Sequence, residues 1–436
     1  MRRVFSALVL LAAIATVGAA QEPVAPAGPL SLLQAIAMGR KQAVAATIAR
    51  VNVREAEART GERRADLLPN ISGSAGVSRQ TFNIDEFGIP IASGVTDPFT
   101  IWRFQVRASQ AVFDPSAITR LRAAHDTANA AGLDAQAVGE QAGAIAGLAY
   151  LRVLSAQETV KAREADSTVA AQLLDEARQL VSAGVSPAID QTRSEVSFGA
   201  VRTQLEVARN TADRSRLDLL RTLDLPPASR VTLADSLGLG KLAVPLEPDS
   251  AAAFARQHRR ELAAERARTT AAQQTLKAVK YENLPSLGLS GSYQQTGRST
   301  PELAGTYTVQ LHLSVPILDG FRRQSRAREE GERLQVQQIR EHDMGNQVET
   351  EAREAVLDLA SAQQQVAIAG DRLRLAEQEL SQAGERFKSG VAGSVETTNA
   401  QSSVIAARDA LIQARLNYGT ARVSAYQALG VIDQLQ

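Results

Sequence analysis

The sequence has no cysteine and few aromatic residues. Without cysteine the chain can form no disulfide framework, no thiolate metal site and no thiol nucleophile, and it lacks the acylation site of a bacterial lipoprotein. Its four histidines are scattered along the chain, at His125, His258, His312 and His342. We therefore expect neither a metal site nor any other cofactor.

The chain also carries almost no net charge. Its formal net charge is +1, with basic and acidic residues interleaved, so the sequence predicts no nucleic-acid partner. It has no glycine-rich phosphate loop and no nucleophile elbow, so nothing in it supports an enzyme. Aromatic residues make up only 4% of the chain and its apolar residues are dispersed, which favours long helices that pack closely through small side chains.

The N-terminus has the pattern of a secretory signal peptide. Met1 is followed by two arginines, then by an apolar stretch from Ala7 to Val17 and by the small residues of a cleavage site, so we expect residues 1–20 to be removed. A membrane anchor is the alternative, but the apolar stretch is shorter than the ~20 residues that span a bilayer. Residues 21–30 are predicted to form a linker.

The rest of the chain reads as two copies of one plan. Pro69, in LLPNISGSAGVSRQ, has a counterpart in Pro285, in NLPSLGLSGSYQQ, at an offset of 216 residues. Gly184 and Gly390 correspond at an offset of 206. Matching landmarks in the same order predict a tandem duplication. We expect a repeat at residues 31–226, an inter-repeat linker or equatorial segment at 227–249 and a second repeat at 250–436.

Long proline-free runs dominate each repeat. A capping box at Ser31 predicts a first helix that continues to about Leu67. Two further helices of roughly 70 residues are expected, from 115 to about 183 and from 320 to about 389. At ~1.5 Å per residue each would be about 100 Å long, too long for a packing element of a globular enzyme. Gly184 and Gly390 are expected to turn each long helix back onto a shorter one.

The shorter helices carry a narrow seam of small residues in alternating steps of four and three. This spacing predicts antiparallel coiled coils, and ordinary amphipathic core helices are the alternative. In the second repeat the seam is Ala400, Val404, Ala407, Leu411, Ala414, Tyr418, Ala421, Ala425 and Ala428. In the first repeat it is Ser194, Phe198, Val201, Leu205, Ala208, Ala212, Ser215, Leu219 and Thr222.

Four segments alternate apolar and polar residues, as β-strands do. In TIWRFQVRASQAVF and TYTVQLHLSVPI, apolar residues occupy one face and polar residues the other, over the length of a strand that crosses an outer membrane. The two Ser/Gly-rich segments quoted above alternate more weakly and are each expected to pair with the stronger strand that follows. Soluble ribbons that cap a helical rod are the alternative. Four strands cannot close a barrel, whereas three copies of the chain would supply twelve.

At this point the sequence resembles the TolC family of outer-membrane channel proteins. The resemblance covers nearly all of the chain after the signal peptide. It rests on LSLLQAIAMG, on the strand entries LPNISGSAG and LPSLGLSG, on VFDP and PILDG where strands lead into helices, and on the turns ARQLVSAGVSPAID and GERFKSGVAGSVET. Each motif alone has low specificity, but together they follow the order of the family across a duplicated chain.

The resemblance implies a mainly α fold with membrane β-strands: long antiparallel coiled-coil hairpins plus four strands per chain. Three chains would form a 12-stranded outer-membrane β-barrel in lipid, with a helical barrel that extends into the periplasm. The implied role is the passive exit duct of a tripartite efflux pump or a type I secretion system. The implied partners are a homotrimer, a periplasmic adaptor protein and an inner-membrane transporter. A soluble periplasmic coiled-coil adaptor or structural protein remains the alternative.

Three groups of functional residues are expected, two from the resemblance and the third, in the lumen, from the alternation of the strands. Asp190, Glu396 and Asn399 would lie at a periplasmic gate, where the family carries acidic residues. Asn399 departs from the family pattern, because a second carboxylate is usual at that place. Adaptor tips are expected to dock at Leu180, Val181, Gly184, Val185, Phe387, Gly390 and Val391. The lumen of the barrel would be lined by Arg103, Arg107 and His312.

Overall fold

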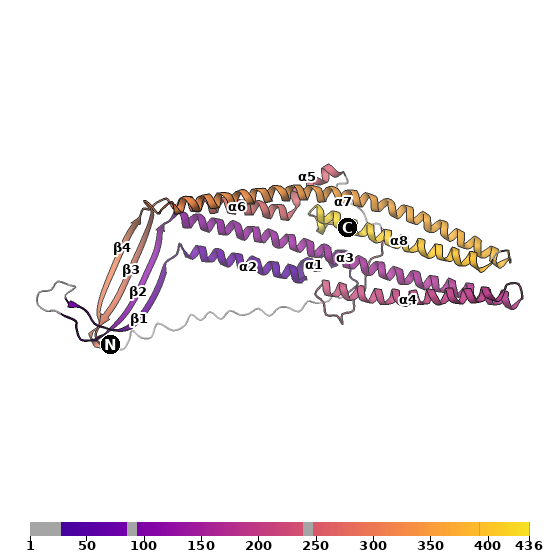
Figure 1. Cartoon of the computed structure of the whole chain (residues 1–436), viewed down its shortest axis with the longest axis horizontal. Coiled ribbons are helices and arrows are strands. Elements are labelled where there is room, and N and C mark those ends of the chain that lie inside the picture. The colour runs from indigo at the N-terminus through magenta and orange to yellow at the C-terminus, as the bar shows by residue number, and fades with distance from the viewer. Residues whose placement is uncertain (1–27, 85–93, 239–246, 392, 436) are drawn as a thin grey trace.

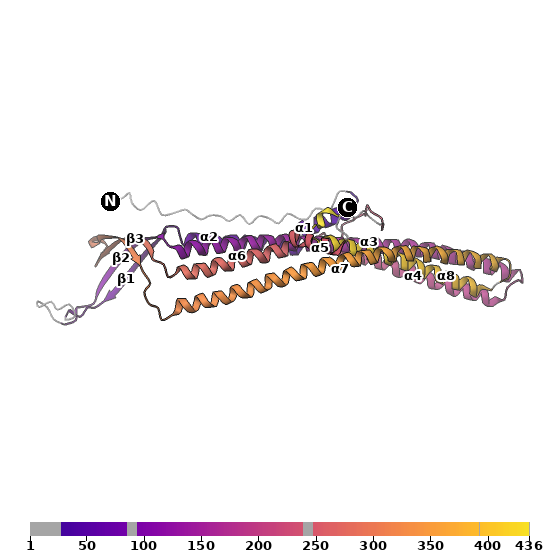
Figure 2. The same ribbon diagram turned by 90° about the horizontal axis from the view of Figure 1, so that it is seen from above.

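The computed structural model describes residues 28–84, 94–238, 247–391 and 393–435. The predicted signal peptide, residues 1–20, lies outside these ranges. So do residues 21–27 of the first predicted linker and residues 239–246 of the second. The described chain is long and narrow, with a sheet at one end and the turns of two helical hairpins at the other (Figures 1 and 2).

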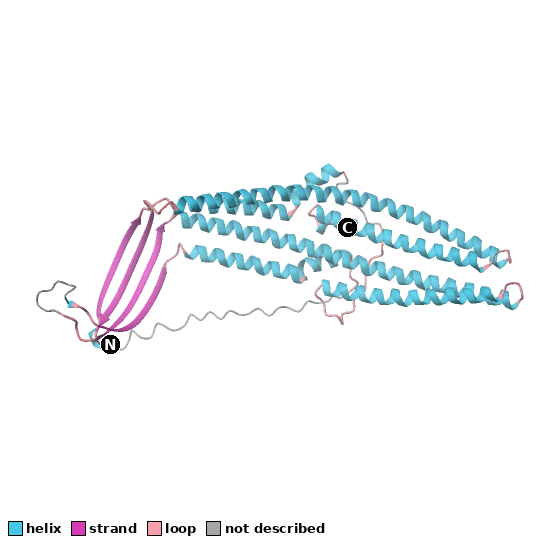
Figure 3. Cartoon of the chain, in the orientation of Figure 1, coloured by secondary structure: helices cyan, strands magenta, loops and turns pink. Residues whose placement is uncertain are grey.

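The same order of elements occurs twice: two helices, two strands, a long helix and a shorter helix. The first half contains α1 Leu32–Gln42, α2 Val44–Ala65, β1 Asn70–Gln80, β2 Phe99–Phe113, α3 Pro115–Ser182 and α4 Ala188–Thr222. The second contains α5 Pro248–His258, α6 Arg260–Tyr281, β3 Ser286–Gly297, β4 Ala304–Ser314, α7 Arg322–Lys388 and α8 Ser394–Ala428. Short 3₁₀ helices lie at Thr300–Glu302 and Ile432–Gln434. Figure 3 shows how few of the described residues are loop.

The first helix of each half is broken, contrary to the prediction of one continuous helix from 31 to about 67. The predicted capping box at Ser31 is present, but the backbone is extended at Ala43 and again at Arg259. Contacts with distant segments explain the second break. Arg259 donates a hydrogen bond to the carbonyl oxygen of Ala428 at 3.2 Å, and Gly430 packs directly against the backbone of His258. Tertiary contact therefore overrides a local preference for helix.

The two long helices match the prediction closely. α3 has 68 residues and α7 has 67. Asp114 caps α3 by accepting a hydrogen bond from the backbone of Ala117, and Pro115 occupies the first turn. Gly184 and Gly390 follow the long helices with φ of 75° and 71°, a left-handed conformation that favours glycine. Each then reverses the chain into a shorter helix.

The predicted seams face the inside of the hairpins. In α8, seven of the nine seam residues are buried and the other two, Leu411 and Ala421, pack against a buried cluster with α7. No seam residue of α4 is exposed. Alanine at these positions allows the close helix contact that the spacing predicts.

The four strands form one antiparallel sheet in the order β1-β2-β3-β4. Residues that are paired across strands lie on the same face, so the register places Val77, Trp102, Tyr293 and Tyr307 with the other apolar alternating residues on one face. That apolar face is open in the single chain; Tyr307 is 81% exposed. β1 and β4 are the unpaired edges of the sheet.

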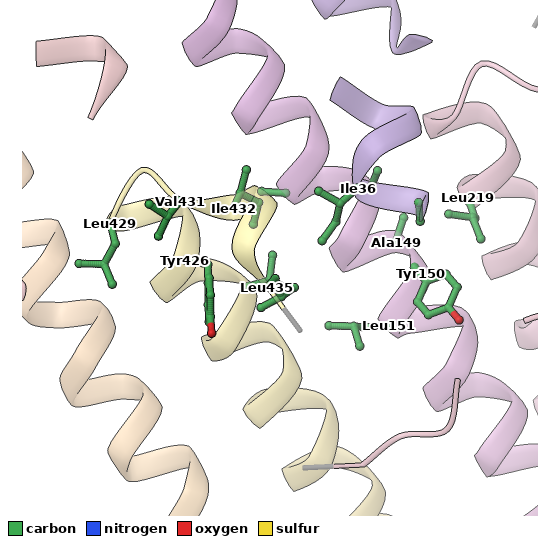
Figure 4. Packing of buried hydrophobic residues seen from close by; sticks show 14 of the residues in the cluster. Ile36, Ala149, Tyr150, Leu151, Leu219, Tyr426, Leu429, Val431, Ile432 and Leu435 are labelled. Carbon is green, nitrogen blue, oxygen red and sulfur yellow. The ribbon is translucent and has the colours of Figure 1, made fainter. Parts of the chain in front are cut away.

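The largest buried cluster lies at the waist of the molecule, between the sheet and the hairpin turns. Figure 4 shows Tyr150 of α3 and Tyr426 of α8 among the buried residues of this cluster. The segment after α4 is tied into it, because Leu30 donates a backbone hydrogen bond to Thr232 at 2.8 Å and accepts one from Ala234 at 2.9 Å. None of the described helices is both long and apolar enough to cross a membrane.

Candidate functional site

The two hairpin turns, at residues 183–187 and 389–391, lie together at the end of the molecule opposite the sheet (Figure 1). We call them the tips. A Cβ added to Gly390 would lie 3.5 Å from Cγ1 of Val185, so the tips are in contact. Lys388 forms an ion pair with Glu176 at 3.5 Å, which links α7 to α3 just behind the turns.

Asp190 joins the two hairpins. It lies in the first turn of α4, is only 4% exposed, and accepts a hydrogen bond from Oγ of Ser394, in the first turn of α8, at 2.5 Å. Arg193 lies 3.7 Å from the same carboxylate. Both helices begin here, so the partial positive charge of their N-termini favours a carboxylate at this place. Asp190 is therefore a buried contact within one chain, and its predicted role at a gate stays a prediction.

Glu396 has a different environment from Asp190. Its side chain is partly exposed and forms an ion pair with Arg386, on the other arm of the same hairpin, at 3.0 Å. Asn399 is exposed, one turn further along α8. The arginine offsets part of the negative charge of Glu396, which the sequence argument did not foresee because Arg386 lies on the other helix.

The residues predicted to dock an adaptor divide by exposure. Val185 and Val391 are open, and Val391 is 70% exposed, while Gly184 and Gly390 form the turns themselves. Leu180 and Val181 are half-buried.

Phe387 differs from the other predicted docking residues, and its predicted role in docking stays a prediction. Phe387 is only 1% exposed. It lies one helical turn after Ala383, which is also buried, so both side chains are on the inner face of α7. Its role is to pack the end of the hairpin.

The three residues predicted for the lumen share the polar face of the sheet. Arg103 is paired with Thr296 and Arg107 with Ser292, both polar, and His312 is paired with Gly288. The imidazole of His312 covers Gly288 so closely that a Cβ there would lie 2.5 Å from its ring. The sheet thus separates a weakly basic polar face from an apolar face, as the alternation predicts.

A buried ion-pair network that the sequence did not reveal connects the hairpins midway along their length. Arg163 and Asp166 of α3 bond to one another at 2.8 Å, and they also bond across to Asp409 and Arg408 of α8. Burial raises the pKa of Asp166, although both arginines oppose the shift. Partners more than 240 residues apart leave no local signal in a sequence. Within the part of the chain that the structure describes, no three potential ligands gather as a metal site.

Comparison with known proteins identifies similar chains. A family model described as "Outer membrane efflux protein" matches residues 36–223 and 253–431. The chain is 27% identical over 325 residues to Protein CyaE of Bordetella pertussis and 25% identical over 297 residues to Outer membrane efflux protein BepC of Brucella suis biovar 1. These alignments cover 71% and 66% of this chain, but 64% and 63% of the two relatives.

The fold has close counterparts among solved structures. The Campylobacter jejuni CmeC outer membrane channel superposes with a TM-score of 0.80 at 15% sequence identity. The match covers 92% of this chain and 86% of that one. The arrangement of strands, long helices and hairpin tips described above is therefore one already seen in a solved protein.

Proposed function

Because the chain belongs to the outer membrane efflux protein family, we propose that three copies form a channel-tunnel that serves as the passive exit duct of an efflux pump or type I secretion system. The duct would begin as a barrel in the outer membrane and continue as a helical tunnel into the periplasm. A periplasmic adaptor would open it at the tips, and an inner-membrane transporter would supply the cargo and the energy.

The observation that carries this proposal is the incomplete sheet. One face is apolar and open, and the backbone groups along the outer edges of β1 and β4 have no strand partner among the residues that the structure describes. In lipid each unsatisfied backbone group costs several kcal/mol, so the edges have to be paired with strands of other copies. Three copies supply twelve strands, and twelve strands can close a barrel.

The helices support the same assembly. α6 packs between α3 and α7, whereas its counterpart α2 packs against α3 and, among the described elements, has no second long helix on its other side. Ala264 of α6 is fully buried, whereas its counterpart Ile48 on α2 is 55% exposed. Val336 and Ile339 are likewise exposed on α7. A neighbouring copy whose α7 packs on α2 would bury both apolar surfaces and repeat the contact between α3 and α6.

The tips are where we place control of the duct. Val185 and Val391 offer exposed apolar side chains to an adaptor, next to the turn glycines. Three copies would bring three Glu396 carboxylates, each beside its Arg386, around one axis near Asn399. A ring of carboxylates raises the local concentration of cations in a narrow pore. Asp190 would contribute by holding the two tips of each chain together.

Two measurements test the function. The full-length protein, expressed in a Gram-negative host, is expected in the outer-membrane fraction and in planar bilayers should form channels whose conductance rises when the cognate adaptor is added. Release by osmotic shock, with no channels in bilayers, would instead indicate a soluble periplasmic rod and overturn the proposal.

A further inference from the structure

A cavity of about 340 Å³ lies at the waist of the molecule, beside the N-terminal end of α1. It is open on one side and is lined by elements from both halves of the chain: α1, α3, α8 and residues 235–238, which follow α4. Most of its wall is apolar, and the hydrocarbon side chains come from Leu32, Leu33, Leu151, Leu154, Leu237, Val423 and Leu435. This volume corresponds to roughly ten water molecules at about 30 Å³ each.

A buried arginine lines this cavity without a partner. Arg422 of α8 is only 7% exposed, and no residue in the described ranges gives it a hydrogen bond or an ion pair. Its Nε is fully shielded from solvent. A guanidinium stays charged in proteins, and burying one without an opposing charge costs several kcal/mol. The arrangement therefore favours an anion beside Arg422.

The carboxylate that lines the same cavity is already engaged. Asp235 accepts hydrogen bonds from the backbone N–H of Leu32 at 2.7 Å and from the Tyr150 hydroxyl at 2.9 Å. It does not come within ion-pair distance of Arg422. A second arginine, Arg415, also lines the cavity, is exposed, and has no ion-pair partner among the described residues. The cavity thus has two guanidinium groups, and its one carboxylate is hydrogen-bonded to Leu32 and Tyr150 and not to either arginine.

The two halves of the chain differ at one position between the equivalent pairs of arginines. At an offset of 206 residues, α4 carries Arg209, Asp213 and Arg216 where α8 carries Arg415, Gly419 and Arg422. The acidic residue between the two arginines is a glycine in α8. That glycine also makes space, since a Cβ at position 419 would lie 3.1 Å from Cδ1 of Leu151. Position 419 therefore carries no negative charge and lets α8 lie close to the wall of the cavity. Among the described residues Asp213 forms no ion pair with Arg209 or Arg216, and Nε of Arg216 is also shielded without a hydrogen-bond partner.

We propose that this cavity binds a small organic carboxylate with a short hydrocarbon tail. Arg422 anchors the carboxylate group through paired N–H donors, the geometry in which a guanidinium recognises a carboxylate. Arg415 attracts the anion at the mouth, and the leucine side chains cover the tail. Because the ligand would touch α1, α3 and α8 together, its binding stabilises the waist of the molecule. The site does not depend on the proposed duct.

Hexanoate is a suitable probe, with hexanamide as the uncharged control of the same shape. The full-length wild-type protein in detergent is titrated with each compound by calorimetry, and its thermal unfolding is followed in parallel. Hexanoate is expected to bind saturably and to raise the unfolding temperature, because a ligand that binds only the folded state stabilises it. Hexanamide should do neither.

Arg422→Met is the decisive variant, and Arg216→Met, at the equivalent place in α4 and away from the cavity, is its matched control. Loss of the guanidinium should weaken hexanoate binding roughly ten-fold or more, as expected for charged hydrogen bonds, while Arg216→Met should bind as wild type does. Without ligand, Arg422→Met should unfold at the wild-type temperature or above it, because an unpaired buried charge has gone. Arg422→Gln and Arg415→Gln, which keep a polar side chain but lose the charge, are expected to weaken hexanoate binding as well.

Three results would overturn the proposal. The first is no saturable hexanoate binding by the wild-type protein. The second is equal binding by wild type and Arg422→Met, which would place the ligand elsewhere. The third is a marked loss of stability in ligand-free Arg422→Met, which would mean that another copy of the chain already supplies the opposing charge.

Discussion

Glu140 is a carboxyl group whose surroundings disfavour its charged form. It lies on α3 facing α6, is almost fully buried, and is 3.6 Å from Nε of Arg260. Burial raises the pKa of Glu140 to about 7. Arg260 and Arg40 oppose the shift, and Glu261 and Asp433 reinforce it. The sequence could not predict this, since the four neighbours come from three other segments.

We expect Glu140→Gln to flatten the pH dependence of stability. The folded state holds the proton on Glu140 up to about pH 7, whereas an unfolded chain releases it near 4.5. Stability from this group is therefore full below pH 4.5 and falls as the pH rises to 7, by at most about 3 kcal/mol. Denaturant unfolding at pH 5 and pH 8 should show a smaller difference for Glu140→Gln than for wild type. An unchanged difference would mean that Glu140 is ionised in the folded protein.

The hydrogen bond between Ser394 and Asp190 should hold the tips together. Ser394→Ala leaves a buried carboxylate without its donor, a loss of about 1–3 kcal/mol. Hydrogen exchange is expected to become faster in the first turns of α4 and α8 and to stay unchanged at the waist. Ser389→Ala is the matched control, because Ser389 is exposed and bonds only to carbonyls of its own helix. Equal exchange in both variants would remove Asp190 from any role at the tips.

Glu396 is the accessible carboxylate at the tips. We expect Glu396→Ala to reduce the preference of the channel for cations, because the ring of carboxylates would be gone and Arg386 would be left unpaired. The measurement is single-channel reversal potential under a salt gradient, with and without divalent cations. Wild-type selectivity and divalent sensitivity in the variant would exclude Glu396 from the gate.

At the scale of elements, the close packing of the hairpins depends on small seam residues. Ala407 is fully buried between α8 and α7, and its neighbour Ala406 is exposed. Ala407→Leu should destabilise the protein by about 1–3 kcal/mol or more, because the added carbons have no room. Ala406→Leu should be nearly neutral. Thermal unfolding of both variants checks this, and equal effects would contradict a packed seam at this place.

Most elements could be predicted from the sequence because their signals are periodic. The steps of four and three residues predicted the seams, and the alternation of apolar and polar residues predicted the strands. The glycines at 184 and 390 predicted the turns after α3 and α7. Two features that escaped prediction depend on contacts with other elements: the break at Arg259 and the burial of Phe387. The inner face of α7 and the predicted docking surface at the tips are different faces of the same helix. Phe387 is a single aromatic residue near the turn, and the sequence alone does not indicate on which of these faces it lies.

At the scale of the whole molecule, the duplication explains which helix surfaces and strand edges are covered within one chain and which stay exposed. Contacts between the halves bury α6 and pair β2 with β3, while the equivalent surfaces of α2 and α7 and the edges of β1 and β4 stay free. The family and the fold could be recognised from ordered motifs alone. The tip contact at Asp190, the network at Arg163 and the cavity at Arg422 could not, because each joins residues on helices that are distant in the sequence.

The most direct test of the assembly is disulfide cross-linking between the two edges of the sheet. β1 and β4 are on opposite sides of the four-stranded sheet, so a disulfide between them has to join different copies. The chain has no cysteine of its own, which gives a clean background. Ser74→Cys in β1 is combined in turn with Thr306→Cys, Thr308→Cys or Gln310→Cys in β4, all on the polar face of the sheet.

Under oxidising conditions in native membranes, at least one pair should give a covalent trimer and no larger species, since a disulfide requires Cα atoms within about 7 Å of each other. Each single-cysteine variant should remain monomeric on a non-reducing gel. Only monomers with every pair, or an open ladder that extends beyond three copies, would contradict a closed barrel shared by three chains.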